Sequence, residues 1–215
     1  MPKQRIGIYS KLEENINVIT HAFGLLFSNL AFVLLMIKAI GHGDGLVIAS
    51  FIVYGLSLIL LYLASTLYHN SKDMTKRARL QVFDHTSIYV LIAGTYTPFM
   101  LIALNNTLGW LIFGIIWILA IAGIILKLFF TGRFDLILTI MYIVMGWVII
   151  FAIKPLLNSL ALEGVILLFA GGVSYTLGAV IYRIKKIPLN HAIFHIFVLV
   201  GSLCHFLSVY YYIAF

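Results

Sequence analysis

Three histidines, an aspartate and a serine are the residues of this chain whose types and spacing could do chemistry. Ser65 and His69 lie four positions apart, as do His191 and His195, so each pair projects from one face of its segment if that segment is helical. Three imidazoles without a thiolate are typical of a tetrahedral zinc site that keeps one position open for water. A carboxylate nearby, here Asp84, can take a proton from that water. If the fold brings these five residues together, they predict a catalytic zinc site.

Each of the five residues is given a role in this interpretation. The metal ligands for Zn²⁺ are His69, His191 and His195. Asp84 orients or deprotonates the water, and Ser65 hydrogen-bonds the ligands or the reacting oxygen. A single intramembrane histidine or serine often only hydrogen-bonds a neighbouring helix, so the prediction depends on all five lying at the same depth and on the same side.

The elements that must position these residues are membrane-spanning helices. Of 215 residues, 63% are hydrophobic and 10% are charged, and the mean hydropathy is +1.10, which leaves too few polar groups to cover a globule in water. A hydrocarbon core of about 30 Å needs about 20 apolar residues per helix. We therefore predict an all-α integral membrane protein with a single seven-helix domain over residues 1–215. The approximate spans are 17–40, 46–69, 84–104, 108–129, 135–154, 161–183 and 190–214.

Lysine and arginine lie mostly on one side of this predicted topology. Cytoplasmic loops carry an excess of these residues, which indicates a cytoplasmic N-terminus and an extracytoplasmic C-terminus in the cell membrane. The net charge of +7 then reflects topology and attraction to anionic lipid, so no nucleic-acid partner is expected. The far side holds only Lys38 and Lys154, and the cytoplasmic side holds Lys3, Arg5, Lys11, Lys72, Lys76, Arg77, Arg79, Lys127, Arg133, Arg183, Lys185 and Lys186.

Counting crossings places the candidate residues together. The second span ends, and the third and seventh begin, on the predicted cytoplasmic side, so His69, Asp84, His191 and His195 share one side of the membrane. Asn190 is predicted to cap the start of the last helix, because asparagine is a favoured N-cap.

Other polar residues in the spans are assigned lesser roles. Glu14 and His21 lie on the same helix side near the start of the first span, and are interpreted as structural residues or partners of the site. His205 lies about 15 Å along the last helix from His195, too far to share its metal, and is predicted to hydrogen-bond another helix. The single Cys204 excludes an intramolecular disulfide and a multi-cysteine metal site.

Several motifs resemble the hemolysin III branch of the progestin and adipoQ receptor family, over nearly the whole chain. The Ser, His, Asp and paired His positions are also similar to a wider superfamily of membrane hydrolases that includes alkaline ceramidases. The resemblance implies a seven-helix bundle with a cytoplasmic N-terminus and a zinc near the cytoplasmic face, held by the three histidines with Asp84 beside its water. Phe194 departs from the tryptophan expected between the paired histidines. The motifs are Glu14-Asn15-Ile16-Asn17 with Thr20-His21, Ser65-Thr66-Leu67-Tyr68-His69, Asp84-His85-Thr86-Ser87-Ile88-Tyr89, Ala93-Gly94-Thr95-Tyr96-Thr97-Pro98 and His191-Ala192-Ile193-Phe194-His195.

Three functions remain open at this point. A zinc-dependent, ceramidase-like hydrolase would cleave an amide or ester bond of a membrane lipid that enters from the bilayer. A receptor or signalling scaffold would use the zinc structurally, and Asp84 as a fourth protein ligand would then close the site. A membrane-perturbing cytolysin is the third, although a secreted pore former should be soluble before insertion and this chain is apolar throughout.

Overall fold

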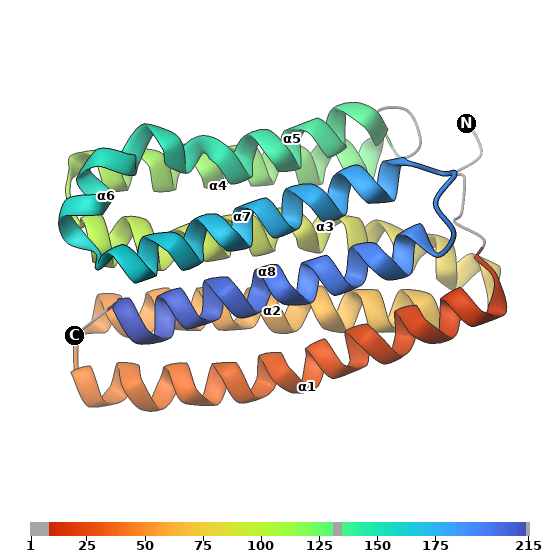
Figure 1. Cartoon of the computed structure of the whole chain (residues 1–215), viewed down its shortest axis with the longest axis horizontal. Coiled ribbons are helices and arrows are strands. Elements are labelled where there is room, and N and C mark those ends of the chain that lie inside the picture. The colour runs from red at the N-terminus through yellow and green to blue at the C-terminus, as the bar shows by residue number, and fades with distance from the viewer. Residues whose placement is uncertain (1–8, 131–134, 214–215) are drawn as a thin grey trace.

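The fold is a bundle of long apolar helices joined by short loops (Figure 1). The computed structural model describes residues 9–130 and 135–213, so Lys3, Arg5 and Arg133 of the predicted basic side lie outside the described residues. The helices are α1 (Lys11–His42), α2 (Gly45–Asn70), α3 (Met74–Pro98), the π-helix η1 (Phe99–Leu104), α4 (Thr107–Phe129), α5 (Asp135–Trp147), the 3-10 helix η2 (Val148–Ala152), α6 (Ile153–Ser159), α7 (Leu162–Arg183) and α8 (Asn190–Tyr212).

Seven helical stretches in the described part of the chain are long and apolar enough to cross a membrane. Helix α3 continues through η1 into one stretch, Met74–Leu104, and α5, η2 and α6 together form another, Leu136–Ser159. The predicted fold class, an all-α seven-helix membrane protein, is confirmed.

Two helices begin earlier than the spans 17–40 and 84–104 that the sequence predicts. Ser10 accepts a hydrogen bond from the backbone N–H of Glu13 at the start of α1, and Asp73 accepts two at the start of α3. Side-chain oxygens at these positions satisfy backbone donors that the first turn leaves free, so both helices extend beyond their apolar stretches. The added turns place polar side chains at the end of the bundle where α2 ends and α8 begins.

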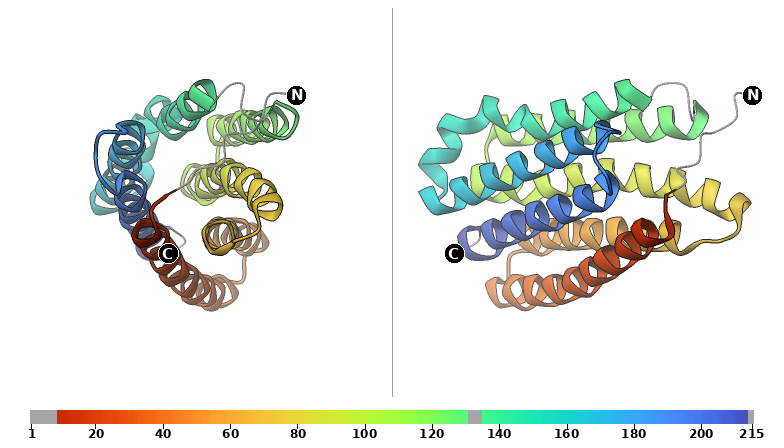
Figure 2. Two further views of the ribbon diagram at one scale, coloured as in Figure 1. Left: turned by 90° about the vertical axis from the view of Figure 1, so that its right-hand side faces the viewer. Right: turned by 45° about the vertical axis from the view of Figure 1, so that its right-hand side comes forward.

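The helices form a closed ring in the end-on view, with α3 toward its interior (Figure 2). In the most apolar stretch of α3 and η1, 72% of the residues are buried, against 22–50% in the other six stretches. Helix α1 packs against both α2 and α8. The last helix of the chain is thereby brought beside the first, and the start of α8 lies at the same end of the bundle as the end of α2.

The outward face is apolar and the polar contacts lie inside. Along α1, Ile19, Phe23 and Leu26 are exposed, as suits contact with lipid chains. Inside, the hydroxyl of Tyr62 on α2 donates to Ser202 Oγ on α8 at 2.7 Å, and Tyr175 Oη of α7 lies 2.8 Å from the same Ser202 oxygen. Such interhelical hydrogen bonds contribute about 0.6 kcal/mol each in membrane proteins, so most of the cohesion comes from packing.

Candidate metal centre

Three histidine side chains from two helices converge at one end of the bundle. His69 lies near the end of α2, and His191 and His195 lie in the first turns of α8. All three are buried, and each offers a ring nitrogen such that these atoms lie within 4.8 Å of one another. The Nε2 atoms of His69 and His191 are 3.0 Å apart. The convergence that was predicted from residues up to 126 positions apart in the chain (69 to 195) is therefore present in the structure.

The start of α8 is fixed by contacts with two other parts of the chain. Leu189 precedes the helix in the left-handed conformation with φ 55°, and Asn190 is the first helical residue rather than the N-cap that the sequence predicts. The Asn190 amide instead donates to the carbonyl of Tyr182 at 2.7 Å and ties α8 to the end of α7. The backbone N–H of His191 donates to Glu13 Oε1 at 3.1 Å, so a side chain of α1 satisfies a free donor of the first turn.

The second ring nitrogen of each histidine contacts a side chain from the beginning of the chain. His69 Nδ1 lies 2.8 Å from Glu14 Oε2, and His191 Nδ1 lies 3.0 Å from the hydroxyl of Tyr9. His195 Nδ1 lies 3.4 Å from Thr20 Oγ1. Burial raises the pKa of the Tyr9 phenol well above its ordinary value, so this group stays neutral beside His191.

Asp84 and Ser65 line a cavity together with His191 and His195. Asp84 is close enough to His69 and Ser65 to interact with both, yet the group of ligand atoms within 4.8 Å contains the histidines without this carboxylate. The Ser65 hydroxyl is buried and has no hydrogen bond of ordinary geometry within the described residues. Buried hydroxyl groups normally have a hydrogen-bond partner. A water or a substrate oxygen beside the histidines would supply one for Ser65.

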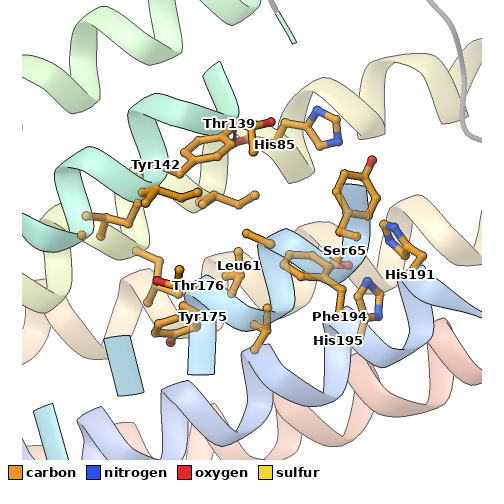
Figure 3. A pocket seen from close by; sticks show the side chains of 18 of the residues that line it. Leu61, Ser65, His85, Thr139, Tyr142, Tyr175, Thr176, His191, Phe194 and His195 are labelled. Atoms are coloured by element: carbon orange, nitrogen blue, oxygen red, sulfur yellow. Dashed lines mark hydrogen bonds between the residues drawn. The ribbon is translucent and has the colours of Figure 1, made fainter. Parts of the chain in front are cut away.

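The cavity in front of the histidines has a volume of about 810 Å³. Figure 3 shows His191, His195 and Ser65 on one side of this space, His85, Thr139 and Tyr142 across it, and Tyr175 and Thr176 at its other end. Its further lining includes the apolar side chains of Phe99, Ile149, Leu168, Phe169 and Val198. The cavity is therefore polar and ionisable near the histidines and mostly apolar and aromatic away from them.

Two further histidines are buried in the bundle outside the three-histidine group. His21 of α1 stacks on His195 with ring centroids 3.5 Å apart, and neither of its ring nitrogens has a hydrogen-bond partner among the described residues. His205 Nε2 lies 3.0 Å from the carbonyl of Leu168 on α7, which confirms the predicted interhelical hydrogen bond. Sequence reasoning missed Tyr9 and Thr20 as contacts of the histidines, and Lys127 as a buried residue that lines the cavity.

The residues present fit a bound metal ion. The donor set is three imidazoles, which suits zinc and related transition metals, and two Nε2 atoms already lie at 3.0 Å from each other as ligands of one ion would. The site could therefore hold a divalent cation with three protein ligands.

The fold and the site define a class: seven-helix membrane proteins with three buried histidines, two of which line a large cavity. Comparison with known proteins agrees with this class. The profile of the family described as "Haemolysin-III related" matches residues 9–206. The chain belongs to the hemolysin III family.

Relatives extend over most of the chain. "Hemolysin-3" of Bacillus cereus is 49% identical over 201 residues, 94% of this chain and 92% of the relative. The "Hemolysin-3 homolog" of Bacillus subtilis is 49% identical over 200 residues, 93% of this chain and 94% of the relative. The human "Monocyte to macrophage differentiation factor" is 26% identical over 167 residues, 75% of this chain and 69% of the relative. The resemblance inferred from the sequence motifs is confirmed.

Proposed function

We propose that this chain is a zinc-dependent hydrolase of an amide or ester bond in a membrane lipid. One observation carries the proposal: three buried imidazoles come together without Asp84 as a fourth close ligand atom, and two of them, His191 and His195, line a cavity of about 810 Å³ that is polar at their end and mostly apolar beyond it. A structural zinc site is usually closed by four protein ligands, whereas a catalytic one keeps a position open. An amphiphile with its polar bond at the histidines and its acyl chain among the apolar residues would match this lining.

The side chains of the site have separate tasks in this reaction. When bound, zinc supplies Lewis acidity toward a carbonyl and lowers the pKa of a water to about 7. The Asp84 carboxylate accepts the proton of the attacking water and returns it to the leaving amine or alcohol as the carbonyl–nitrogen or carbonyl–oxygen bond breaks. Ser65 donates a hydrogen bond to the carbonyl oxygen, whose negative charge grows as the water oxygen bonds to carbon. The apolar lining excludes bulk water and aligns the bond.

The test compares Asp84→Asn with the unaltered protein and with Asp44→Asn. Asp44 caps α2 and accepts from the backbone N–H groups of Leu46 and Val47, a role that asparagine also fills, so this variant controls for the loss of one carboxylate. Membranes that contain each protein are profiled for lipids without a preselected target. We expect Asp84→Asn to keep its metal and to slow the conversion of one lipid class about 10²–10⁴-fold, with Asp44→Asn unchanged. Identical profiles for all three proteins, each carrying metal, would favour the structural-metal scaffold instead.

A second candidate function, cytolysis, is suggested by the name of the Bacillus cereus relative, Hemolysin-3. The exposed apolar faces of the helices suit a protein that resides in a membrane rather than one that is released into water. Purified protein added to red cells distinguishes the two candidates. Lysis that persists in His191→Ala would support the cytolysin, and no lysis at any concentration would oppose it.

A further inference from the structure

We infer that the beginning of the chain, Tyr9 with the first turns of α1, orients all three metal ligands, and that Glu14 is the principal positioning residue. The inference rests on the proposed function insofar as the three histidines bind a metal. Its basis is that Glu14, Tyr9 and Thr20, three residues within one short segment, contact the Nδ1 atoms of three different histidines. The ligands belong to α2 and α8, and α1 is the helix that packs against both.

The Thr20 contact fixes the tautomer of His195. The Thr20 hydroxyl donates its single proton to the carbonyl of Ile16 at 2.8 Å, so its oxygen accepts from His195 Nδ1 at 3.4 Å. The backbone of Asn17 also hydrogen-bonds His195. A ring that donates from Nδ1 presents the lone pair of Nε2, which is the form that binds a metal.

The Glu14 contact does the same for His69 and adds a charge. An ionised carboxylate only accepts, so Glu14 Oε2 takes the Nδ1 proton of His69 at 2.8 Å and leaves Nε2 facing His191. Hydrogen bonds from imidazole to carboxylate raise the basicity of the ligand and fix its ring, and their removal weakens metal binding about 10–100-fold. Neutral partners such as Tyr9 and Thr20 orient the rings without this charge, so their removal should weaken binding less.

Glu14 is itself held from α3. The guanidinium of Arg77 donates to Glu14 Oε1, the carboxylate oxygen that His69 leaves free. Arg77 also donates to the carbonyl of Ser71 at 3.3 Å and stacks over the ring of Tyr68, 4.7 Å from its centroid. The position of the carboxylate is therefore set by α1, α2 and α3 together, and it holds the imidazole in one orientation before any metal arrives.

The experiment measures zinc affinity in the full-length protein by competition with a chelator. Three variants each remove one contact with little change of shape: Glu14→Gln, Tyr9→Phe and Thr20→Val. Their matched controls are Glu163→Gln in the first turn of α7, Tyr211→Phe on the exposed face of α8, and Thr66→Val, whose hydroxyl also donates to a backbone carbonyl one turn earlier. The same proteins loaded with Co²⁺ report the geometry of the site through visible absorption.

We expect Glu14→Gln to weaken zinc binding about 10–100-fold and to shift the cobalt bands, while its control changes neither. Tyr9→Phe and Thr20→Val should weaken binding by smaller factors in the same direction. A purely structural role of α1 would reduce the yield of inserted protein and leave the cobalt bands of the surviving fraction unchanged. If Glu14→Gln does not insert, the other two variants decide, and unchanged affinity in both overturns the inference.

The outcomes separate this inference from the proposed function. Stoichiometric zinc in the unaltered protein with equal affinity in all three variants overturns the positioning role of α1 and leaves the hydrolase proposal standing. An unaltered protein that binds no zinc overturns the hydrolase proposal itself.

Discussion

Each imidazole of the three-histidine site has one nitrogen available for an ion and the other held by the protein. For His69 and His191 the available atoms are the Nε2 pair 3.0 Å apart, and the held atoms contact Glu14 and Tyr9. This division explains why buried rings next to one another are tolerated: each ring keeps a hydrogen-bond partner on one side. The three imidazoles are therefore already oriented as metal ligands by their contacts with the protein.

At this residue scale, His191→Ala should abolish stoichiometric metal binding while the protein stays inserted, because only two of the three imidazoles remain and alanine keeps the backbone N–H that donates to Glu13 at the start of α8. Metal analysis of purified protein checks the outcome, with His42→Ala as the control, since His42 is exposed at the other end of α1. Full zinc content in His191→Ala would show that this histidine is not a ligand.

The chemistry-bearing residues were predictable from the sequence, and their supporting contacts were not. Type and spacing singled out Ser65 and His69, and span counting placed them on one side with the pair on α8. Tyr9 lies before the first predicted span, and no periodicity indicates that it folds back over His191. Lys127 was used only as a marker of topology, because its burial depends on how α4 turns within the bundle.

At the scale of helices, α4 and η1 pack in close contact with each other. Pro98 predicts an interruption of the third span, but the π-helical form that follows could not be predicted, since it depends on packing across two elements. A Cβ added to Gly109 would lie 2.3 Å from the backbone oxygen of Met100, so the two segments touch where only glycine fits.

Gly109→Ala should destabilise the protein by about 1–3 kcal/mol, because a backbone atom cannot move aside as a side chain can. Gly114→Ala in the same helix is the control: its added methyl meets nothing within 4 Å, and alanine favours the helix by up to about 1 kcal/mol. Thermal unfolding in detergent measures both. Equal transition temperatures for the two variants would contradict the close packing of α4 and η1.

The first turn of α3 should depend on pH through Asp73. Backbone N–H groups of Lys76 and Thr75 hold the pKa of this carboxyl below its ordinary value of 3.8. Because the folded pKa is the lower one, the charged cap stabilises the turn above pH 3.8 and loses this effect as the pH falls through the folded value. Amide hydrogen exchange at Lys76 should show this loss, and Asp73→Asn, which keeps a capping oxygen without the charge, should remove it. An equal loss in the variant would assign the effect to another group.

At the scale of the whole molecule, the start of α1, the end of α2, the start of α3 and the start of α8 lie at one end of the bundle (Figure 1), and the three histidines are at this end. The described loops at this end carry Lys72 and Lys185, and α3 adds Lys76, Arg77 and Arg79 in its first turns. Seven crossings were predictable because apolar length alone determines them. The cavity was not predictable in size or lining, since it is the space that seven helices leave between them.

The excess of basic residues predicts that the histidine end faces the cytoplasm. Impermeant thiol labelling of intact cells tests this in a Cys204→Ser background. His42→Cys and Lys72→Cys each place a thiol at an exposed position, the first at the end of α1 and the second in the loop after α2. We expect His42→Cys to be labelled from outside and Lys72→Cys only after the membrane is permeabilised. The reverse pattern would place the three histidines at the outer face, and a lipid would then have to reach the site from the outer leaflet.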